Sequence, residues 1–139
     1  MNTAYRVWDG EHMHYWDDEG IKLLIEGDKW TLYLEVATGH LLDVADSEDG
    51  KSVLMWGTGS KDKKGKDIYQ KDITEESYIH PMSKENIIDR YVIERKNGFD
   101  RIEHVSGKEG FYRHLWLRTD EVEVIGDVFQ NPDLLEGAE

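Results

Sequence analysis

The chain has no cysteine and only two prolines among its 139 residues. Without cysteine it can form no disulfide, use no thiolate nucleophile and bind no zinc through sulfur, and an intracellular location is the natural expectation. No segment approaches the roughly 20 apolar residues of a membrane-spanning helix, and no apolar run follows a basic N-terminus. We therefore expect a soluble protein of the cytoplasm that does not associate with a membrane.

Positive charge is scarce, with 17 Lys and Arg against 30 Asp and Glu, for a formal net charge of −13. The first 50 residues alone carry 12 acidic and 3 basic side chains. Affinity for a phosphate backbone comes from cationic side chains, so this balance argues against nucleic-acid binding by the whole surface. The basic residues cluster in one place, at Lys61, Lys63, Lys64 and Lys66.

That cluster lies in WGTGSKDKKGKDIYQKDIT, which resembles a phosphate-binding loop but lacks its spacing. Five residues separate Gly59 from Gly65, and Lys66 is followed by Asp67 where a Walker loop has a Ser or Thr. The segment is more typical of a charged turn between two strands, with Gly65 supplying the turn geometry. Contact of the lysines and Tyr69 with a nucleic acid stays open as an alternative.

Alternation of apolar and polar residues recurs along the chain and predicts many short strands. The segments that alternate, or that are short and apolar, are AYRVWDG, HMHYW, IKLLIEG, WTLYLEVATGHLLDVAD, SVLMWG, DIYQKDIT, RYVIERKNGFDRIEHV and FYRHLWLRTDEVEVIGDVFQ. The Asn97-Gly98 pair is the preferred type I′ turn of a hairpin. Strands at such spacing predict a mainly β fold of antiparallel strands, a barrel or a sandwich.

Two segments could be helical. SKENIIDRYV begins with Ser83 as a possible N-cap and places Ile87, Ile88 and Tyr91 on one face, although the same letters could lead directly into the hairpin. NPDLLEG has Pro132 at a first-turn position and predicts a single C-terminal turn. We therefore expect one or two short helices in all.

A metal site is one hypothesis for HMHYWDDE. His12 and His14 are two residues apart, so on a strand they point the same way, and with Glu19 they match the first half of the cupin pattern. The distal half of that pattern is missing, because Pro81 and Pro132 are followed by Met-Ser and Asp-Leu. Exposed histidines on a polar strand face are the favoured interpretation, and we predict no cofactor and no metal.

No segment carries the pattern of an enzyme. Acidic pairs such as Glu75-Glu76 arise by chance in a chain with 30 acids, and no nucleophile elbow is present. The aromatics are a richer resource, with five Trp and seven Tyr. Those left exposed would suit a protein interface or base stacking, and Trp8, Tyr15 and Trp16 are the candidates for an interface.

Three segments together resemble the YopX family of phage and prophage proteins. They are YRVWD near the start, MWGTGSKDKKGKDIYQKDI in the middle and VEVIGDVFQNPDLLE near the end. In the family the middle block reads approximately TGxKDxxGKxIYEGDI and the last block VIGNIYENPELL. The chain departs from the pattern at Gln70-Lys71, in place of Glu-Gly, and at Asp127, in place of Asn. The first departure means that Lys71 has an ordinary negative φ or bears some strain.

The resemblance implies one YopX-like domain over residues 1–139, a small barrel for which an SH3-like form is one option, and an N-terminal β element that serves association between subunits. A subdivision into an acidic element, residues 1–50, and a barrel-like part, residues 51–139, is an alternative. It implies no established activity. Our first hypothesis is a non-enzymatic accessory protein of the host bacterium's cytoplasm that binds a host or phage protein and forms a homo-oligomer. The second is a nucleic-acid-associated barrel, and the third a metal-binding protein.

Overall fold

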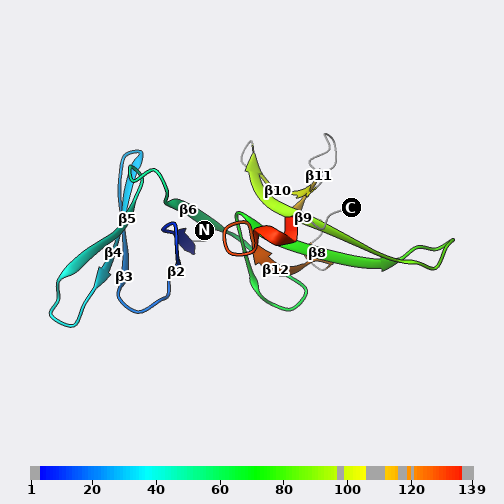
Figure 1. Ribbon diagram of the computed structural model, residues 1–139, viewed down its shortest axis with the longest axis horizontal. Helices are drawn as coiled ribbons and strands as arrows, with labels where there is room; N and C mark the ends of the chain where they lie inside the picture. The colour runs from blue at the N-terminus through cyan, green and yellow to red at the C-terminus, as the bar shows by residue number, and fades with distance from the viewer. Residues whose placement is uncertain (1–3, 97–98, 106–111, 116–118, 120, 136–139) are drawn as a thin grey trace. The chain divides into compact units, whose positions relative to one another are not determined.

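The computed structural model describes residues 4–96, 99–105, 112–115, 119 and 121–135. The chain forms two compact units, Met1–Gly57 and Thr58–Glu139. Both are built of antiparallel strands, and a short 3-10 helix lies near the C-terminal end of the second (Figure 1). The prediction of a mainly β fold is confirmed. No helix in these ranges is long and apolar enough to cross a membrane.

The first unit contains a three-stranded meander and a smaller set of paired strands. The meander has the order β3-β4-β5, with β3 (Ile21–Glu26), β4 (Lys29–Glu35) and β5 (Leu41–Asp46). The other strands are β1 (Tyr5–Trp8), β2 (Met13–Tyr15) and the start of β6 (Val53–Lys61), with β1 between the other two. The predicted break at Gly39 is present as a turn with φ of 82°.

The core of the first unit follows from the period of two along its strands. Leu32 of β4 lies opposite Leu23 on one side and Ala45 on the other, so these side chains share a face of the meander. Val7 of β1 packs with Leu32 and Ala45, and all three are fully or almost fully buried. Partly buried apolar residues surround them, namely Tyr5, Ile21, Leu23, Trp30, Val44 and Leu54.

The second unit is a five-stranded antiparallel sheet of order β11-β10-β9-β8-β12. Its strands are β8 (Asp72–Ile79), β9 (Asn86–Lys96), β10 (Phe99–His104), β11 (Tyr112–His114) and β12 (Glu123–Asp127). The short β7 (Asp67–Tyr69) pairs with β6, and the 3-10 helix η2 (Pro132–Leu135) follows β12. The sheet is curled like half a barrel. Its core is formed by Ile68, Tyr91, Ile93, Ile102, Leu115, Val122 and Val124.

One expectation about the second unit is corrected, and for SKENIIDRYV the alternative of a direct lead into the hairpin holds. DIYQKDIT does not form one strand, because Gln70 and Lys71 turn the chain between β7 and β8. Lys71 has φ of 69°, so the strained alternative for this residue holds. SKENIIDRYV is not helical, since β9 begins at Asn86 and pairs along its whole length with β8 or β10. Ile87 and Ile88 therefore point to opposite faces of a strand.

The remaining turn predictions fare better. The predicted C-terminal turn is confirmed by η2, which begins at Pro132. Asn97-Gly98 lies outside the described residues, and Lys96 and Phe99 on either side of it are cross-strand partners. The far end of the β8–β9 hairpin extends beyond the other strands of its unit (Figure 1). We call residues 77–88 the arm.

Candidate functional site

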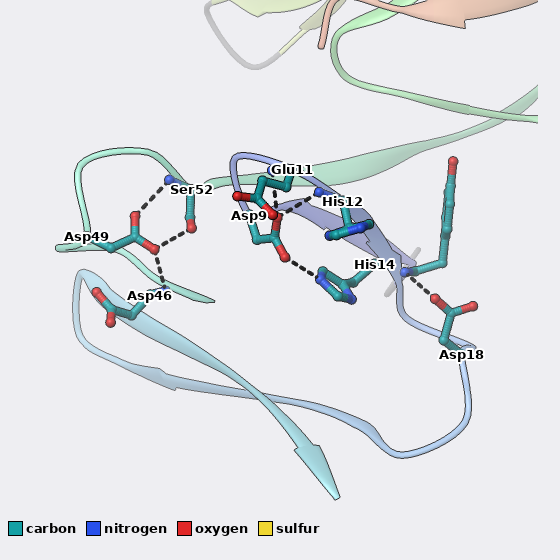
Figure 2. Close-up of polar contacts among 9 residues, drawn as sticks. Asp9, Glu11, His12, His14, Asp18, Asp46, Asp49 and Ser52 are labelled. Atoms are coloured by element: carbon teal, nitrogen blue, oxygen red, sulfur yellow. Dashed lines mark hydrogen bonds and ion pairs between the residues drawn. The ribbon is translucent and has the colours of Figure 1, made fainter. Parts of the chain in front are cut away.

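The turn after β1 is organised by Asp9. Its Oδ1 accepts hydrogen bonds from the backbone N–H groups of Glu11 and His12 at 2.8 and 2.7 Å. Its Oδ2 lies 2.8 Å from Nε2 of His14 (Figure 2). Burial disfavours the charge on Asp9, but these hydrogen bonds outweigh it, so the pKa of Asp9 lies below its ordinary value. The carboxylate thus closes the turn and fixes the His14 ring.

A second carboxylate organises the loop between β5 and β6. Oδ1 of Asp49 accepts from the N–H of Ser52, and Oδ2 accepts from the Ser52 hydroxyl and from the N–H of Asp46 (Figure 2). Oδ1 also accepts from the N–H of Lys51. The Ser52 hydroxyl, followed by the Lys51 N–H, holds the pKa of Asp49 well below its ordinary value. A Cβ on Gly10 would lie 3.1 Å from Cδ of Lys51, so this loop and the turn after β1 are neighbours.

The three residues of the metal hypothesis are not brought together as ligands. His14 is engaged with Asp9, whereas His12 lies in the turn before β2 and Glu19 lies exposed in the turn before β3. Across the described ranges, no group of three or more His, Asp or Glu side chains is placed to hold a metal ion. In the first unit, the carboxylates of Asp9 and Asp49 therefore serve to stabilise turns.

A surface hollow of about 340 Å³ lies beside the loop between β5 and β6. It is lined by Glu26, Lys29, Trp30, Thr31, Asp46, Ser47 and Glu48. Nζ of Lys29 is 2.8 Å from Oε1 of Glu48, so a lysine of the chain itself neutralises one of the carboxylates. Two hydrogen bonds join the lining residues Trp30 and Ser47. The N–H of Ser47 donates to the carbonyl of Trp30, and the N–H of Trp30 donates to the hydroxyl of Ser47.

The lysine loop is organised from within by Asp62, which is almost fully buried. Oδ1 of Asp62 accepts from the N–H groups of Lys64 and Lys66, both at 2.9 Å, and Oδ2 accepts from the N–H of Val124 in β12 at 2.8 Å. Burial disfavours the charge, but the hydrogen bonds from Val124, Lys66 and Lys64 outweigh it and lower the pKa of Asp62. Gly65 adopts φ of 84°, as its predicted place in the turn requires.

The side chains of this loop point to different environments. Those of the four lysines, Lys61, Lys63, Lys64 and Lys66, are exposed. Nζ of Lys61 lies 3.8 Å from Oδ1 of Asp67, a distance typical of a weak surface ion pair. Tyr69, which sequence analysis grouped with the lysines, is buried, so its ring is not available on the surface for base stacking.

The three aromatic candidates for an interface differ in exposure. Trp8 and Tyr15 are partly buried on one face of the β1–β2 pair. The buried Arg6 lies on the same face, opposite Tyr15 and two residues before Trp8. Trp16 is 42% exposed, and its backbone N–H donates a 3.0 Å hydrogen bond to the backbone carbonyl of Tyr5. Trp16 is therefore the candidate whose indole offers contact area.

Sequence analysis missed a polar cluster in the second unit. The hydroxyl of Tyr91 donates a 3.0 Å hydrogen bond to Oε1 of Glu76, which is buried. The ring of Tyr91 packs edge-to-face on His104, whose Nε2 lies 3.2 Å from Oδ1 of Asp89. Glu76 is opposite Asp89 and Tyr91 is opposite His104 in the sheet. Only this register joins the four side chains, and the sequence offers no signal for it.

Comparison with known proteins agrees with the resemblance of the motifs. A family model described as YopX protein matches residues 4–136. The SPbeta prophage-derived protein YopX of Bacillus subtilis strain 168, described as uncharacterised, is 41% identical over 140 residues, which are 99% of this chain and 98% of the relative. The prediction from the three motifs is thereby confirmed.

Solved structures extend the comparison to the fold. The crystal structure of protein yopX from Bacillus subtilis matches with a TM-score of 0.77 and 38% identity, covering 96% of this chain and 98% of that one. The crystal structure of protein EF1440 from Enterococcus faecalis matches with a TM-score of 0.53 and 23% identity over 95% and 96% of the two chains, which is a likeness of fold alone. By the family match and the identity across nearly the whole of both sequences, this chain belongs to the YopX family of phage and prophage proteins.

Proposed function

We propose that the protein is a phage or prophage accessory factor without enzymatic activity, which acts in the host cytoplasm by binding other proteins and forms a homo-oligomer. The observation that carries the proposal is the exposure of large apolar side chains in both units. They are Trp16, Leu24, Ile25, Leu41, Leu42, Ile79, Met82, Ile88 and Phe99. Single exposed apolar residues are normal on any protein, whereas several on one small surface are typical of an interaction site.

The face of the meander away from the core carries two of these side chains, Leu24 and Leu41. Leu24 alternates with the core residue Leu23, so it lies on the face of the sheet away from the core, where it is opposite Thr31. Leu41 lies opposite Glu35 on β4. Trp16 adds an exposed indole in the same unit. Trp is enriched among the residues that carry most of the binding energy in protein interfaces, and exposed leucines add apolar area that a partner can bury.

The acidic charge of the first unit favours a partner with a basic surface. Met1–Gly57 contains 12 carboxylates and four Lys or Arg, so a basic protein surface would be attracted to it from a distance. Affinity that rests on apolar burial persists at high salt, while the electrostatic part is screened. A protein partner with apolar contacts and a basic rim fits both properties.

A capture experiment with matched variants tests the proposal. The immobilised chain, its Trp16→Ser/Leu24→Ser variant and a Lys22→Ser control are incubated with host-cell lysate at high salt, and retained proteins are identified and then purified for direct binding. Lys22 lies two residues before Leu24 on the same face of β3 and is also exposed. We expect a partner that binds wild type and control but not the double variant. Equal retention by all three chains would remove the surface from consideration.

A nucleic-acid-associated function is the second candidate, and one observation favours it. The four lysines of the loop at residues 61–66 are exposed on a backbone that Asp62 holds in one conformation. A loop with a preformed backbone can present its lysines to a phosphate backbone with less ordering of the chain than a flexible loop would need. The burial of Tyr69 takes away the stacking partner that single-strand binding uses, which ranks this function below protein binding.

A further inference from the structure

The arm is a two-stranded ribbon that its sheet does not flank. Ser77 pairs with Ile88 and Ile79 with Asn86. β12 pairs with β8 only as far as Glu75, and β10 pairs with β9 only from Tyr91 onward. Within the described ranges, neither strand of the arm therefore has a second neighbour. An isolated two-stranded hairpin is at best marginally stable in water, so the arm gains from a partner.

The tip of the arm is held in a defined conformation. Nδ1 of His80 accepts hydrogen bonds from the N–H groups of Met82 and Ser83 at 3.1 and 3.2 Å. The N–H of His80 donates to the carbonyl of Glu85, and the N–H of Lys84 donates to the carbonyl of His80. Lys84 completes the turn with φ of 62°. This ordered turn presents the side chain of Met82, which is 85% exposed.

The strands of the arm present an unprotected apolar face. Ser77 is opposite Ile88 and alternates with Ile79, so Ile79 and Ile88 share one face as diagonal neighbours. They are 60% and 53% exposed. Exposed edge strands usually carry charged residues that prevent association. Here the two charges of the arm, Lys84 and Glu85, both lie in the turn at its tip.

Charge favours a second copy of this chain as the partner. Residues 77–88 have a formal net charge of zero, whereas the whole chain carries −13. Two copies that met through the acidic first unit would repel each other, while two arms approach without like-charge repulsion. The unpaired backbone groups of a strand are best complemented by another strand, and a twofold axis makes one arm complementary to itself.

We propose that the arm is a self-association site, in which the arm of one chain pairs with the arm of a second copy and covers Ile79, Ile88 and Met82. The inference rests on the self-association in the proposed function and gives it a place in the second unit. It is independent of the exposed side chains of Trp16 and Leu24, which the proposed function assigns to a different protein.

Sedimentation of the full chain over a range of concentrations tests the pairing. Wild type is compared with Ile79→Glu/Ile88→Glu and with Phe99→Glu, a matched control because Phe99 is a 56% exposed apolar residue at the start of β10. We expect wild type and control to self-associate and the arm variant to do so roughly 100-fold more weakly or worse, because apolar burial is lost on both chains. A monomeric wild type, or equal association of all three, would overturn the proposal.

A cross-linking measurement keeps the test independent of folding of the double variant. The chain has no cysteine, so a single Ile88→Cys or Ile79→Cys change gives one thiol per molecule, and Phe99→Cys is the control. A disulfide requires Cα atoms about 4.4–6.8 Å apart. Added diamide, a two-electron oxidant, takes up the two electrons and two protons of the two thiols as the S–S bond forms. We expect covalent dimers from the arm thiols and few from position 99. Equal yields at all positions would contradict arm pairing, even where capture through Trp16 succeeds.

Discussion

Nζ of Lys71 lies 2.7 Å from Oε1 and 3.0 Å from Oε2 of Glu94, although the backbone of Lys71 has φ of 69°. The left-handed conformation costs a residue with a Cβ roughly 1–2 kcal/mol. A partly exposed ion pair contributes up to about 1 kcal/mol. The ion pair therefore offsets part of the backbone strain at a position where the YopX pattern has glycine.

Substitutions at Lys71 should separate these two contributions. Because glycine adopts positive φ freely, we expect Lys71→Gly to be more stable than Lys71→Ala by about 1 kcal/mol in the free energy of unfolding. Urea titration of both variants measures the difference. Lys61 in β6 is the control, since there Ala should exceed Gly by about 0.5–1 kcal/mol. The same order at both positions would refute the assignment of strain to Lys71.

A larger side chain at position 126 should destabilise the fold. A Cβ at this position would lie 2.5 Å from Oδ1 of Asn131, the atom that accepts the N–H of Asp127. We expect Gly126→Ala to destabilise the protein by about 1–3 kcal/mol, since the side chain of Asn131 must move. Thermal unfolding of Gly126→Ala, Asn131→Ala and the double variant checks the cause. A double variant that costs the full sum of the single changes would argue against this steric contact.

Asp62 should make folding sensitive to acid. The pKa of Asp62 is lower in the folded chain than in the unfolded chain, where an Asp has a pKa of about 3.9. Ionised Asp62 therefore stabilises the fold at pH values above about 3.9. This contribution is lost as the pH falls through the folded pKa. The NH₂ group of an Asn at position 62 would face the N–H of Val124 in one orientation and the N–H groups of Lys64 and Lys66 in the other. We therefore expect Asp62→Asn to cost about 1–3 kcal/mol at pH 7.

The pH dependence of that cost is the decisive part of the measurement. The difference in unfolding free energy between wild type and Asp62→Asn should shrink as the pH is lowered below about 4, because wild type then loses the same charge. Asp67→Asn is a control at a neighbouring exposed carboxylate whose nearest lysine is 3.8 Å away, and we expect it to cost less than about 0.5 kcal/mol. A constant difference across pH would show that Asp62 is not ionised in the fold.

Nucleic-acid binding is expected to be absent. Labelled single- and double-stranded DNA and RNA are titrated at about 50 mM salt, where phosphate contacts are strongest. We expect no micromolar binding, because the chain carries a net charge of −13. Binding that weakens steeply with salt and disappears when Lys61, Lys63, Lys64 and Lys66 are all changed to Gln would instead establish the second candidate function.

Local sequence signals sufficed where the chain obeys a local rule. Alternating residues gave the strands of the meander, and Pro132 gave the start of η2. The break between β7 and β8 could not be predicted from physical rules, because Lys71 adopts a conformation that its side chain disfavours and that distant Glu94 helps to stabilise. Ile87 and Ile88 fitted a helix and a strand equally, and the pairing with β8 decided the matter.

The candidate site depended still more on contacts distant in sequence. Asp62 stands among lysines in a segment that reads as a solvated turn, yet its carboxylate is buried against the N–H of Val124. Tyr69 follows the same segment and would be placed on the surface with it, although it belongs to the interior. Exposure of Trp16 and burial of Arg6 likewise follow from which strands become neighbours. Residue type alone does not fix these environments.

The boundary between the two units falls inside β6, whose first residues pair with β1 and which also pairs with β7. Each unit thus contains part of β6, so a segment that encodes either unit includes part of this strand. Exchange of one unit between related phages by recombination would preserve folding only when the breakpoint lies outside Val53–Lys61. Folded hybrids of related chains should therefore be joined in the loops that flank this strand, which leave Val53–Lys61 from one parent.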